Sequence, residues 1–192
     1  CAAAMLLATG STYRRLGVPG EDDFIGAGIH FCSTCDGPFY KGKDLLVVGG
    51  GNSGFQEGLF LTRFATSVTI LEAAKQARAS RALQEKVASR ADMQVLTEST
   101  VQEFRGHGRL ESLGIKDLAT GPTKEMPASG VFVYIGLSPN TAFLKGAVEL
   151  DQHGFVVTQP NLETSLPGVF AAGDCRQGST QQVASAVGEG AS

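Results

Sequence analysis

Two cysteines in the stretch GIHFCSTCDGPF are separated by two residues, and an acidic residue follows the second directly. Cys32 and Cys35 at this spacing can bind a metal, form a structural staple or work as a redox couple. A closed zinc site needs about four ligands. His30 precedes the pair, but His107 and His153 lie in separate segments without ligand spacing. We therefore predict no metal site.

The redox interpretation accounts for the cysteines and the acid together. A disulfide that closes so small a loop stabilises a fold only slightly, so a structural staple is disfavoured. A dithiol–disulfide couple needs a proton when one sulfur leaves as a thiolate, and a neighbouring carboxyl group can supply it. We expect Cys32, Cys35 and Asp36 to be the catalytic residues.

A glycine-rich loop follows the continuous apolar run of residues 44–48. In a G-x-G-x-x-G loop the first glycine permits a tight turn, the second lets a pyrophosphate approach the backbone, and the third lets helix and strand pack closely. The helix that follows offers free N–H groups to the phosphates. We expect a dinucleotide to bind through Gly49, Gly51, Asn52, Ser53 and Gly54, with Glu72 at the end of the next strand.

Strand and helix patterns alternate through the middle of the chain, which predicts an α/β fold of the Rossmann type. A segment of short alternating strands, residues 100–126, interrupts this pattern and indicates an antiparallel meander. Strands are expected at 6–10, 44–48, 67–71, 93–96, 131–135, 154–157 and 169–172, and helices at 55–64, at 80–89 and from 181 onward.

Composition narrows the class of protein. Of 192 residues, 42% are hydrophobic and 18% are charged, which is typical of a globular protein. A net charge of −3 without a run of Lys or Arg argues against nucleic acid or an acidic membrane surface as partner. No apolar run approaches the ~20 residues that span a bilayer. Four cysteines do not make a disulfide scaffold, so we expect a cytoplasmic protein.

Five motifs occur in a characteristic order: Thr9-Gly10, CSTCDG, GGGNSG, GLSPNT and GVFAAGDC. In this order the chain resembles thioredoxin reductase-like flavoproteins of the low-molecular-weight type. The resemblance implies a three-layer nicotinamide-dinucleotide-binding domain at 11–136, which carries the redox pair and the meander. It also implies that 1–10 and 137–192 are remnants of an FAD-binding domain, and that the intact protein is a homodimer.

The resemblance also assigns roles to individual residues. Cys35 is similar to the sulfur that meets the flavin, and Cys32 to the one that exchanges with a thioredoxin-like protein. The contacts it implies for the two cofactors, NAD(P)H and FAD, fall on Arg78, Gly136, Gly173, Asp174, Gln182 and Val183.

Three departures from the family pattern matter. The glycine-rich fold that holds the ADP half of FAD is absent, so we expect a fragment that binds FAD weakly. Cys175 stands where an aliphatic residue is usual, and we interpret it as a buried apolar residue. Glu72, Ala73 and Ala74 replace His-Arg-Arg. Because a carboxylate binds ribose hydroxyls and repels a 2′-phosphate, we favour NAD(H) over NADP(H), although Arg78 could bind a phosphate.

The resulting hypothesis is an FAD-dependent disulfide reductase that passes electrons from NAD(P)H through FAD and the cysteine pair to a thioredoxin-like protein. One alternative is an NADH-dependent reductase of a peroxiredoxin system. Another is a nucleotide-sensing module that keeps the fold and has lost turnover. The intact cysteine pair and Asp36 count against the sensor, whereas the missing flavin segment keeps it open for this chain.

Overall fold

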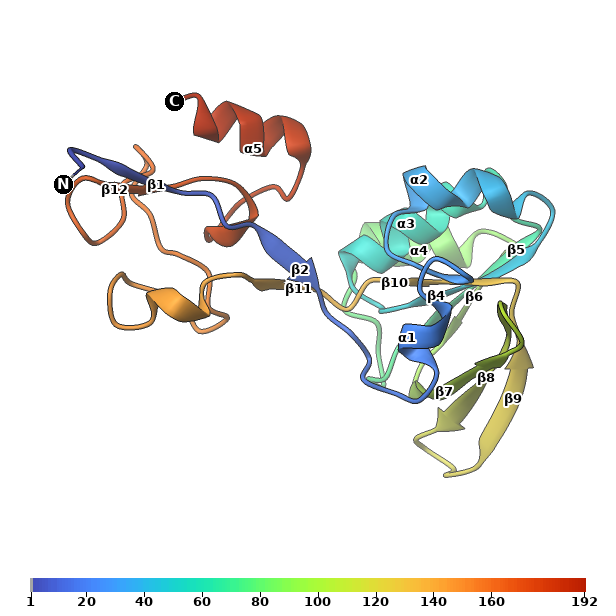
Figure 1. Cartoon of the computed structure of the whole chain (residues 1–192). Coiled ribbons are helices and arrows are strands. Elements are labelled where there is room, and N and C mark those ends of the chain that lie inside the picture. The colour runs from blue at the N-terminus through green and yellow to red at the C-terminus, as the bar shows by residue number, and fades with distance from the viewer. Residues whose placement is uncertain (1) are drawn as a thin grey trace. The chain divides into compact units, whose positions relative to one another are not determined.

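A computed structural model describes residues 2–192 (Figure 1). The chain forms two compact units. The central unit is Arg15–Ile135. The flank unit joins the residues up to Arg14 with Gly136–Ser192, so the chain passes between the units twice. Each unit is built around its own sheets and its own apolar core.

A five-stranded parallel sheet organises the central unit. Its strand order is β3-β10-β4-β5-β6. Parallel strands covered on both faces are continuously apolar, and residues 45–48 of β4 are all buried. The bounds are β3 Ile29–His30, β4 Asp44–Val48, β5 Ser67–Leu71, β6 Met93–Leu96 and β10 Gly130–Val133.

Alternate residues of β4 face two different layers. Leu45 and Val47 pack in a cluster with residues of the helices α3 and α4. Leu46 and Val48 pack in a second cluster with residues of the antiparallel meander. The result is the three-layer arrangement of helices, parallel sheet and meander (Figure 1). The bounds are α3 Asn52–Leu61, α4 Arg81–Ala88, β7 Ser99–Gly106, β8 Leu110–Asp117 and β9 Thr123–Pro127.

Short helical turns lie before β4 and carry the cysteine stretch. Phe24 of the first turn is buried against the meander side of the sheet. The turns are α1 Glu21–Phe24, α2 Ser33–Asp36 and η1 Gly37–Tyr40.

The flank unit contains two small sheets. In one, β1 pairs in parallel with β12; in the other, β2 pairs antiparallel with β11. The buried residues Leu7, Val156 and Cys175 belong to its core. The elements are β1 Met5–Leu7, β2 Ser11–Tyr13, β11 Leu137–Pro139, η2 Ala142–Leu144, β12 Val169–Ala171, η3 Gly173–Cys175 and α5 Val183–Gly190.

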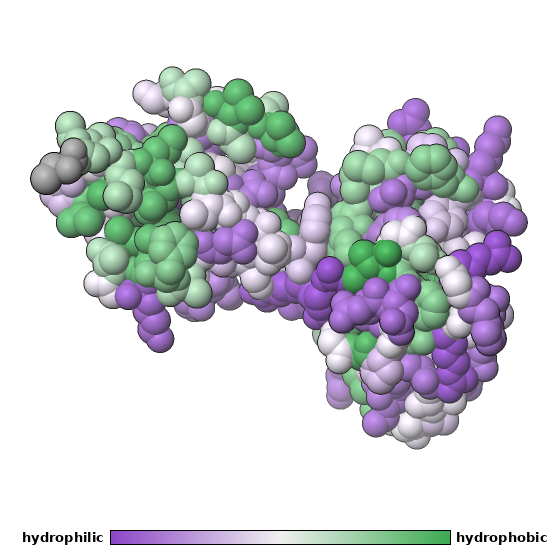
Figure 2. All heavy atoms as spheres, in the orientation of Figure 1, coloured by the Kyte–Doolittle hydropathy of each residue, from purple (hydrophilic) through white to green (hydrophobic). Residues whose placement is uncertain are grey.

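Exposed apolar side chains concentrate in the flank unit. Of the nine large hydrophobic residues that are exposed in residues 2–192, seven belong to it and two to the central unit. Figure 2 shows apolar surface over α5, where Val183 is 82% and Val187 66% exposed. The other five are Met5, Leu6, Tyr13, Phe143 and Leu166.

The sequence predicted the parallel strands and the meander correctly, but some bounds were wrong. The helix expected at 55–64 is α3, which begins at Asn52 and ends at Leu61. The segment 154–157 is not a strand, because Val156 only forms isolated bridges with Leu150 and Arg176. The Cys175 interpretation is confirmed: its side chain is fully buried in the apolar core of the flank unit.

Candidate functional site

The two cysteines of the redox stretch meet at the start of a helical turn. Cys32 is the residue that caps α2, and Cys35 lies within it. Their sulfurs form a disulfide, with the Cα atoms 5.3 Å apart. The backbone N–H of Cys35 donates a hydrogen bond of 3.2 Å to the sulfur of Cys32. A hydrogen bond to sulfur favours its charged form, so this N–H would stabilise a thiolate on Cys32 in the opened disulfide.

This disulfide is accessible from solvent. Cys35 is exposed and Cys32 is half-buried. Thiol–disulfide exchange requires a thiolate to reach one of the sulfurs, so access is one of the conditions for reactivity. The pair is therefore open to attack by an external thiol.

Asp36 contacts a histidine that the sequence analysis considered only as a metal ligand. Its Oδ2 lies 3.4 Å from Nδ1 of His30. The other ring nitrogen, Nε2, is 2.7 Å from the hydroxyl of Tyr40. Burial lowers the pKa of His30, although the Asp36 carboxylate acts in the opposite direction. His30 is thus neutral at pH 7, and its imidazole connects the acid to a phenol.

The glycine-rich loop between β4 and α3 is shaped by three glycines. A Cβ on Gly49 would lie 2.2 Å from the carbonyl oxygen of Tyr134, and φ of Gly49 is +123°. A Cβ on Gly54 would lie 1.8 Å from the carbonyl oxygen of Gly49. By contrast, a Cβ on Gly51 would have no atom within 4 Å. Two glycines allow close backbone packing, and the third leaves open space where a phosphate can approach the backbone.

The residues after Gly51 begin a ten-residue helix whose first amides have no partner within the helix. Such amides bind phosphate groups. The side chain of Asn52 accepts a hydrogen bond of 2.7 Å from the N–H of Ser80, which fastens the loop before α4 to the start of α3. Ser53 is exposed in the first turn.

Glu72 is buried, with 4% of its side chain exposed. Its Oε2 accepts a hydrogen bond of 3.0 Å from the N–H of Gly50, and its Oε1 accepts one of 2.8 Å from the N–H of Ala74. Arg78 is 78% exposed, and its Nε lies 3.9 Å from Oε2. The carboxylate therefore joins the glycine-rich loop to the loop after β5, a role that the sequence did not reveal. Its contact with a ribose stays a prediction.

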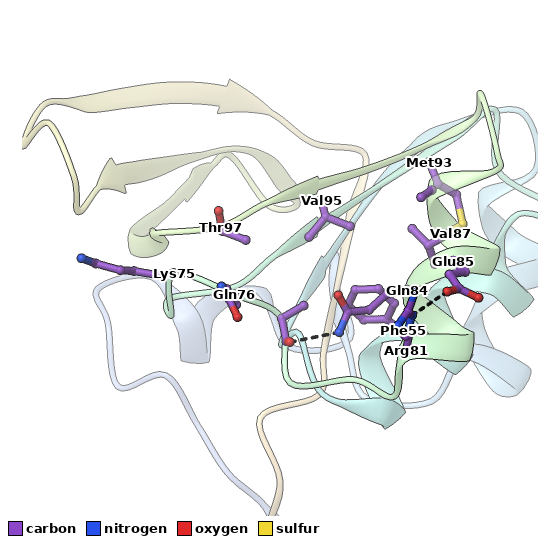
Figure 3. Close-up of a pocket in the computed structure, with 12 residues that line it drawn as sticks. Phe55, Lys75, Gln76, Arg81, Gln84, Glu85, Val87, Met93, Val95 and Thr97 are labelled. Carbon is purple, nitrogen blue, oxygen red and sulfur yellow. Dashed lines mark hydrogen bonds and ion pairs between the residues drawn. The ribbon is translucent and has the colours of Figure 1, made fainter.

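A cavity of about 610 Å³ lies beside the loop after β5 (Figure 3). Its walls come from α3, α4, β6 and this loop, and none of the predicted site residues lines it. Gln84 donates hydrogen bonds to the carbonyl oxygens of Ala77 and Ala79 and so fixes one wall. In Figure 3 the Lys75 side chain extends away from the other labelled side chains. Apolar side chains such as Phe55 and Val95 line the cavity together with polar ones such as Gln84 and Glu85.

The predicted flavin contacts belong to the flank unit. Gly173 has φ of +73°, and Asp174 accepts a hydrogen bond of 3.5 Å from the hydroxyl of Ser11. Gln182 caps α5 and Val183 is its first residue; both are exposed. Gly136, predicted as a cofactor contact at the end of the nicotinamide domain, has φ of +102°, and its carbonyl accepts a hydrogen bond from the N–H of Arg14 where β2 pairs with β11. These roles stay predictions.

The helix α5 is held in place by an ion pair that the sequence did not predict. Arg176 donates to both carboxylate oxygens of Glu189, and the N–H of Gly173 donates to Oε2 over 2.7 Å. The hydrogen bonds from Arg176 lower the pKa of Glu189 to about 2. This cluster ties the helix to the turn that carries Asp174. No sequence signal marks it, since the two charged residues are 13 positions apart.

No group of three or more His, Cys, Asp or Glu side chains in residues 2–192 is arranged to hold a metal ion. No helix in the same part of the chain is long and apolar enough to cross a membrane.

Comparison with known proteins identifies the family. The sequence profile described as "Pyridine nucleotide-disulphide oxidoreductase" matches residues 1–190. The chain belongs to this family. The family description names a pyridine nucleotide and a disulfide, and this chain has a glycine-rich loop and a cysteine pair in one compact unit.

Curated relatives match nearly the whole length of this chain. The thioredoxin reductase of Treponema pallidum is 39% identical over 190 residues, which are 99% of this chain and 62% of the relative. An alkyl hydroperoxide reductase of Pseudomonas aeruginosa (its F subunit) is 43% identical over 191 residues, which are 99% of this chain and 37% of the relative. The chain therefore spans about 60% of the length of the thioredoxin reductases it matches.

Solved structures of oxidoreductases of this family have the same fold. The Lactococcus lactis thioredoxin reductase superposes with a TM-score of 0.83 at 35% identity, covering 98% of this chain and 62% of that one. The T. acidophilum thioredoxin reductase gives a TM-score of 0.83 at 39% identity, and the superposition covers 97% of this chain and 62% of that one. The predicted Rossmann-type α/β fold is confirmed.

Proposed function

We propose that this chain is part of an FAD-dependent disulfide reductase that passes electrons from a reduced nicotinamide through its cysteine pair to a thioredoxin-like protein. One observation carries the proposal: an accessible Cys32–Cys35 disulfide and an open glycine-rich loop belong to the same compact unit. The thioredoxin reductases among its relatives support the identity of the protein substrate.

The central unit, Arg15–Ile135, is proposed to be the nicotinamide-binding domain, for which the sequence suggested the limits 11–136. The Gly51 amide and the first amides of α3 would bind the pyrophosphate, because no Cβ fills the space beside them. The sulfur of Cys32 is proposed to exchange with the protein substrate, since a backbone N–H stabilises its thiolate. Asp36 is proposed to supply the proton that the leaving sulfur needs.

The flank unit is proposed to be part of the FAD-binding domain. Its polar turn at Gly173 and Asp174, with the exposed Gln182 and Val183, fits an extended polar cofactor with an apolar ring. These four residues would hold the flavin, and a bound flavin supplies two-electron transfer between nicotinamide and disulfide. The apolar side chains exposed on this unit support the view that further protein covers it.

The coenzyme is proposed to be NAD(H) rather than NADP(H). Glu72 is fixed by two backbone amides at the end of β5, so its negative charge cannot swing away from an adenosine ribose bound there. Ala73 and Ala74 offer no positive charge to a 2′-phosphate. Lys75, Arg78 and Arg81 are bases close to Glu72 in the sequence, and the contact of Arg78 with Glu72 partly neutralises the charge of Arg78.

A reductase of a peroxiredoxin system is the second candidate. The alkyl hydroperoxide reductase relative at 43% identity favours it. Both candidates use the same chemistry at Cys32 and Cys35 and differ in the protein that receives the electrons. A nucleotide-sensing module is less well supported, because the accessible disulfide has no purpose in it.

The test uses the full-length protein that carries this chain, with Cys32→Ser and Cys35→Ser as variants. We expect each variant to lose reduction of protein disulfides and to keep reduction of the flavin by NADH, because the sulfurs act after the flavin. Disulfide reductase activity that survives either substitution would refute the proposal. A homodimer and a cytoplasmic location remain predictions, which gel filtration and cell fractionation can check.

A further inference from the structure

His30 lies beside the cysteine pair and has no role in the function proposed above. It ends β3, two residues before Cys32, and only 10% of its side chain is exposed. Its ring packs against those of Tyr40 and Phe132, with centroid distances of 5.3 Å to each, and these two rings also contact each other. A polar ring held this firmly keeps one orientation, so its two nitrogens point at fixed partners.

Those partners determine which nitrogen of His30 carries the proton. Nδ1 lies 3.4 Å from Oδ2 of Asp36, and Nε2 lies 2.7 Å from the hydroxyl of Tyr40. When Asp36 is ionised, a lone pair on Nδ1 would face a carboxylate and be repelled. The neutral imidazole therefore has its hydrogen on Nδ1, and Nε2 accepts the hydrogen of Tyr40. The phenol thus fixes the tautomer that Asp36 needs.

We propose that His30 is a positioning residue for Asp36: its Nδ1–H engages Oδ2, so that Oδ1 is the oxygen that carries the proton to the leaving sulfur. Tyr40 supports this arrangement through Nε2. The inference rests on the proposed function insofar as Asp36 is taken as the proton donor to the cysteine pair.

The proton balance of the step is simple. A disulfide that accepts two electrons breaks its S–S bond and needs two protons to become a dithiol. In the proposed reductase a hydride from the reduced coenzyme would supply the two electrons and one proton, and Oδ1 of Asp36 would donate the other proton to the sulfur that leaves as a thiolate. Asp36 becomes a carboxylate whose new charge is stabilised by the N–H of His30. Solvent returns the proton, since 31% of the Asp36 side chain is exposed.

In residues 2–192 the titratable side chains that contact His30 are those of Asp36 and Tyr40. Asp36 faces it from α2 and Tyr40 from η1, while the Phe132 ring from β10 carries no charge. Burial, and secondly Asp36, raises the pKa of Tyr40, so the phenol keeps its proton at neutral pH. Below the pH range in which phenols ionise, the pH dependence of the disulfide's reactivity therefore comes from Asp36, from His30 or from the sulfurs themselves.

The test measures reduction of the Cys32–Cys35 disulfide by dithiothreitol in the chain of residues 1–192. The rate is divided by the thiolate fraction of the reductant at each pH. We expect this corrected rate to fall as pH rises, and Asp36→Asn to abolish the fall. His30→Phe keeps an aromatic ring in the packing and removes both nitrogens. We expect it to lower the corrected rate roughly tenfold and to shift the fall to higher pH, because the carboxylate has lost its donor.

His30→Asn is the matched variant, because its amide nitrogen can occupy the position of Nδ1. We expect it to restore most of the rate and the original pH dependence. Tyr40→Phe, which keeps the ring and removes the hydroxyl, should shift the profile in the same direction as His30→Phe by a smaller amount. It replaces His30→Phe as the test if that variant fails to fold.

The outcomes separate positioning from packing. A His30→Phe protein with the rate and the pH profile of the unsubstituted chain would overturn the inference. Equal losses in His30→Phe and His30→Asn with an unshifted profile would show a packing role only, and would overturn it as well. Because dithiothreitol needs neither coenzyme nor flavin, this result is independent of whether the proposed electron transfer from NADH occurs.

Discussion

Two substitutions in the glycine-rich loop should have different effects. Gly51→Ala should weaken nucleotide binding, and Gly54→Ala should destabilise the fold. Gly51 has φ of −85° and ψ of −178°, a conformation that alanine adopts without strain, and a Cβ there meets no atom within 4 Å. A Cβ on Gly54 would lie 1.8 Å from the carbonyl oxygen of Gly49 and 3.0 Å from its carbon. Both are backbone atoms, so no side chain can rotate to relieve the clash.

The expected magnitudes follow from these contacts. Gly54→Ala forces strand and helix apart, and overpacking of this kind costs about 1–3 kcal/mol of unfolding free energy, or roughly 2–12 °C in Tm. Gly51→Ala should cost under about 1 kcal/mol, the difference between the two residues at a helix cap. Its methyl group occupies the space that a phosphate needs. Loss of one or two charged hydrogen bonds, at about 1.5–3 kcal/mol each, weakens NADH binding roughly 10- to 100-fold or more.

Thermal melts and calorimetric titration with NADH measure the two effects on the same samples. Gly58→Ala is the matched control, since it lies in the same helix and the nearest atoms to its Cβ would be side-chain atoms of Ile70 and Met93 at 3.4 Å, an ordinary contact distance. We expect this control to change Tm by no more than a few degrees and to leave the Kd for NADH unchanged. Unaltered NADH binding in Gly51→Ala would refute the phosphate site, and an unaltered Tm in Gly54→Ala would refute the packing argument.

Three other predictions concern single side chains. Glu189→Gln should destabilise the flank unit by about 1–3 kcal/mol at pH 7. Because Arg176 lowers the pKa of Glu189 to about 2, this stability is present above about pH 4.5 and is lost as pH falls toward 2, where melts of variant and parent should coincide. Cys175→Ala should leave disulfide reductase activity unchanged, because the thiol is buried and donates hydrogen bonds to backbone carbonyl oxygens. Glu72→Ala in the full-length enzyme should reduce the preference for NADH over NADPH, measured as the ratio of kcat/KM values.

Each of these has a contrary result. Glu189→Gln melts that differ from the parent equally at every pH would show that charge is not the cause. Loss of activity in Cys175→Ala with an unchanged Tm would indicate a second redox centre. A tenfold or greater preference for NADPH in the unsubstituted enzyme would mean that Glu72 does not discriminate at the ribose.

Most of the central unit could be predicted because its signals are local. The continuous apolar run of β4 and the glycines that follow it determine strand, turn and helix within a dozen residues. Short elements gave no such signal. The strand β3 has two residues and depends on pairing with β10, which lies about a hundred positions later in the chain. Its existence is decided by tertiary contact rather than by periodicity.

The parts of the candidate site that the sequence did not reveal are contacts between distant residues. His30 was visible as a residue near the cysteines, but its contacts with Asp36 and Tyr40 depend on how the turns α2 and η1 fold back on β3. Glu72 was visible as an acid after the second strand of the unit, but the sequence does not show that its two backbone partners come from different loops. Side-chain chemistry indicated which residues matter, and packing determined what they touch.

The central claim is that electrons from NADH reach the Cys32–Cys35 disulfide. The most direct measurement is an anaerobic titration of the full-length protein with NADH, followed by alkylation and mass spectrometry of the cysteine peptides. We expect both Cys32 and Cys35 to become alkylated in proportion to the NADH consumed beyond flavin reduction, while Cys175 is unchanged in its reactivity. A flavin that is fully reduced by excess NADH while the Cys32–Cys35 disulfide stays intact would contradict the account.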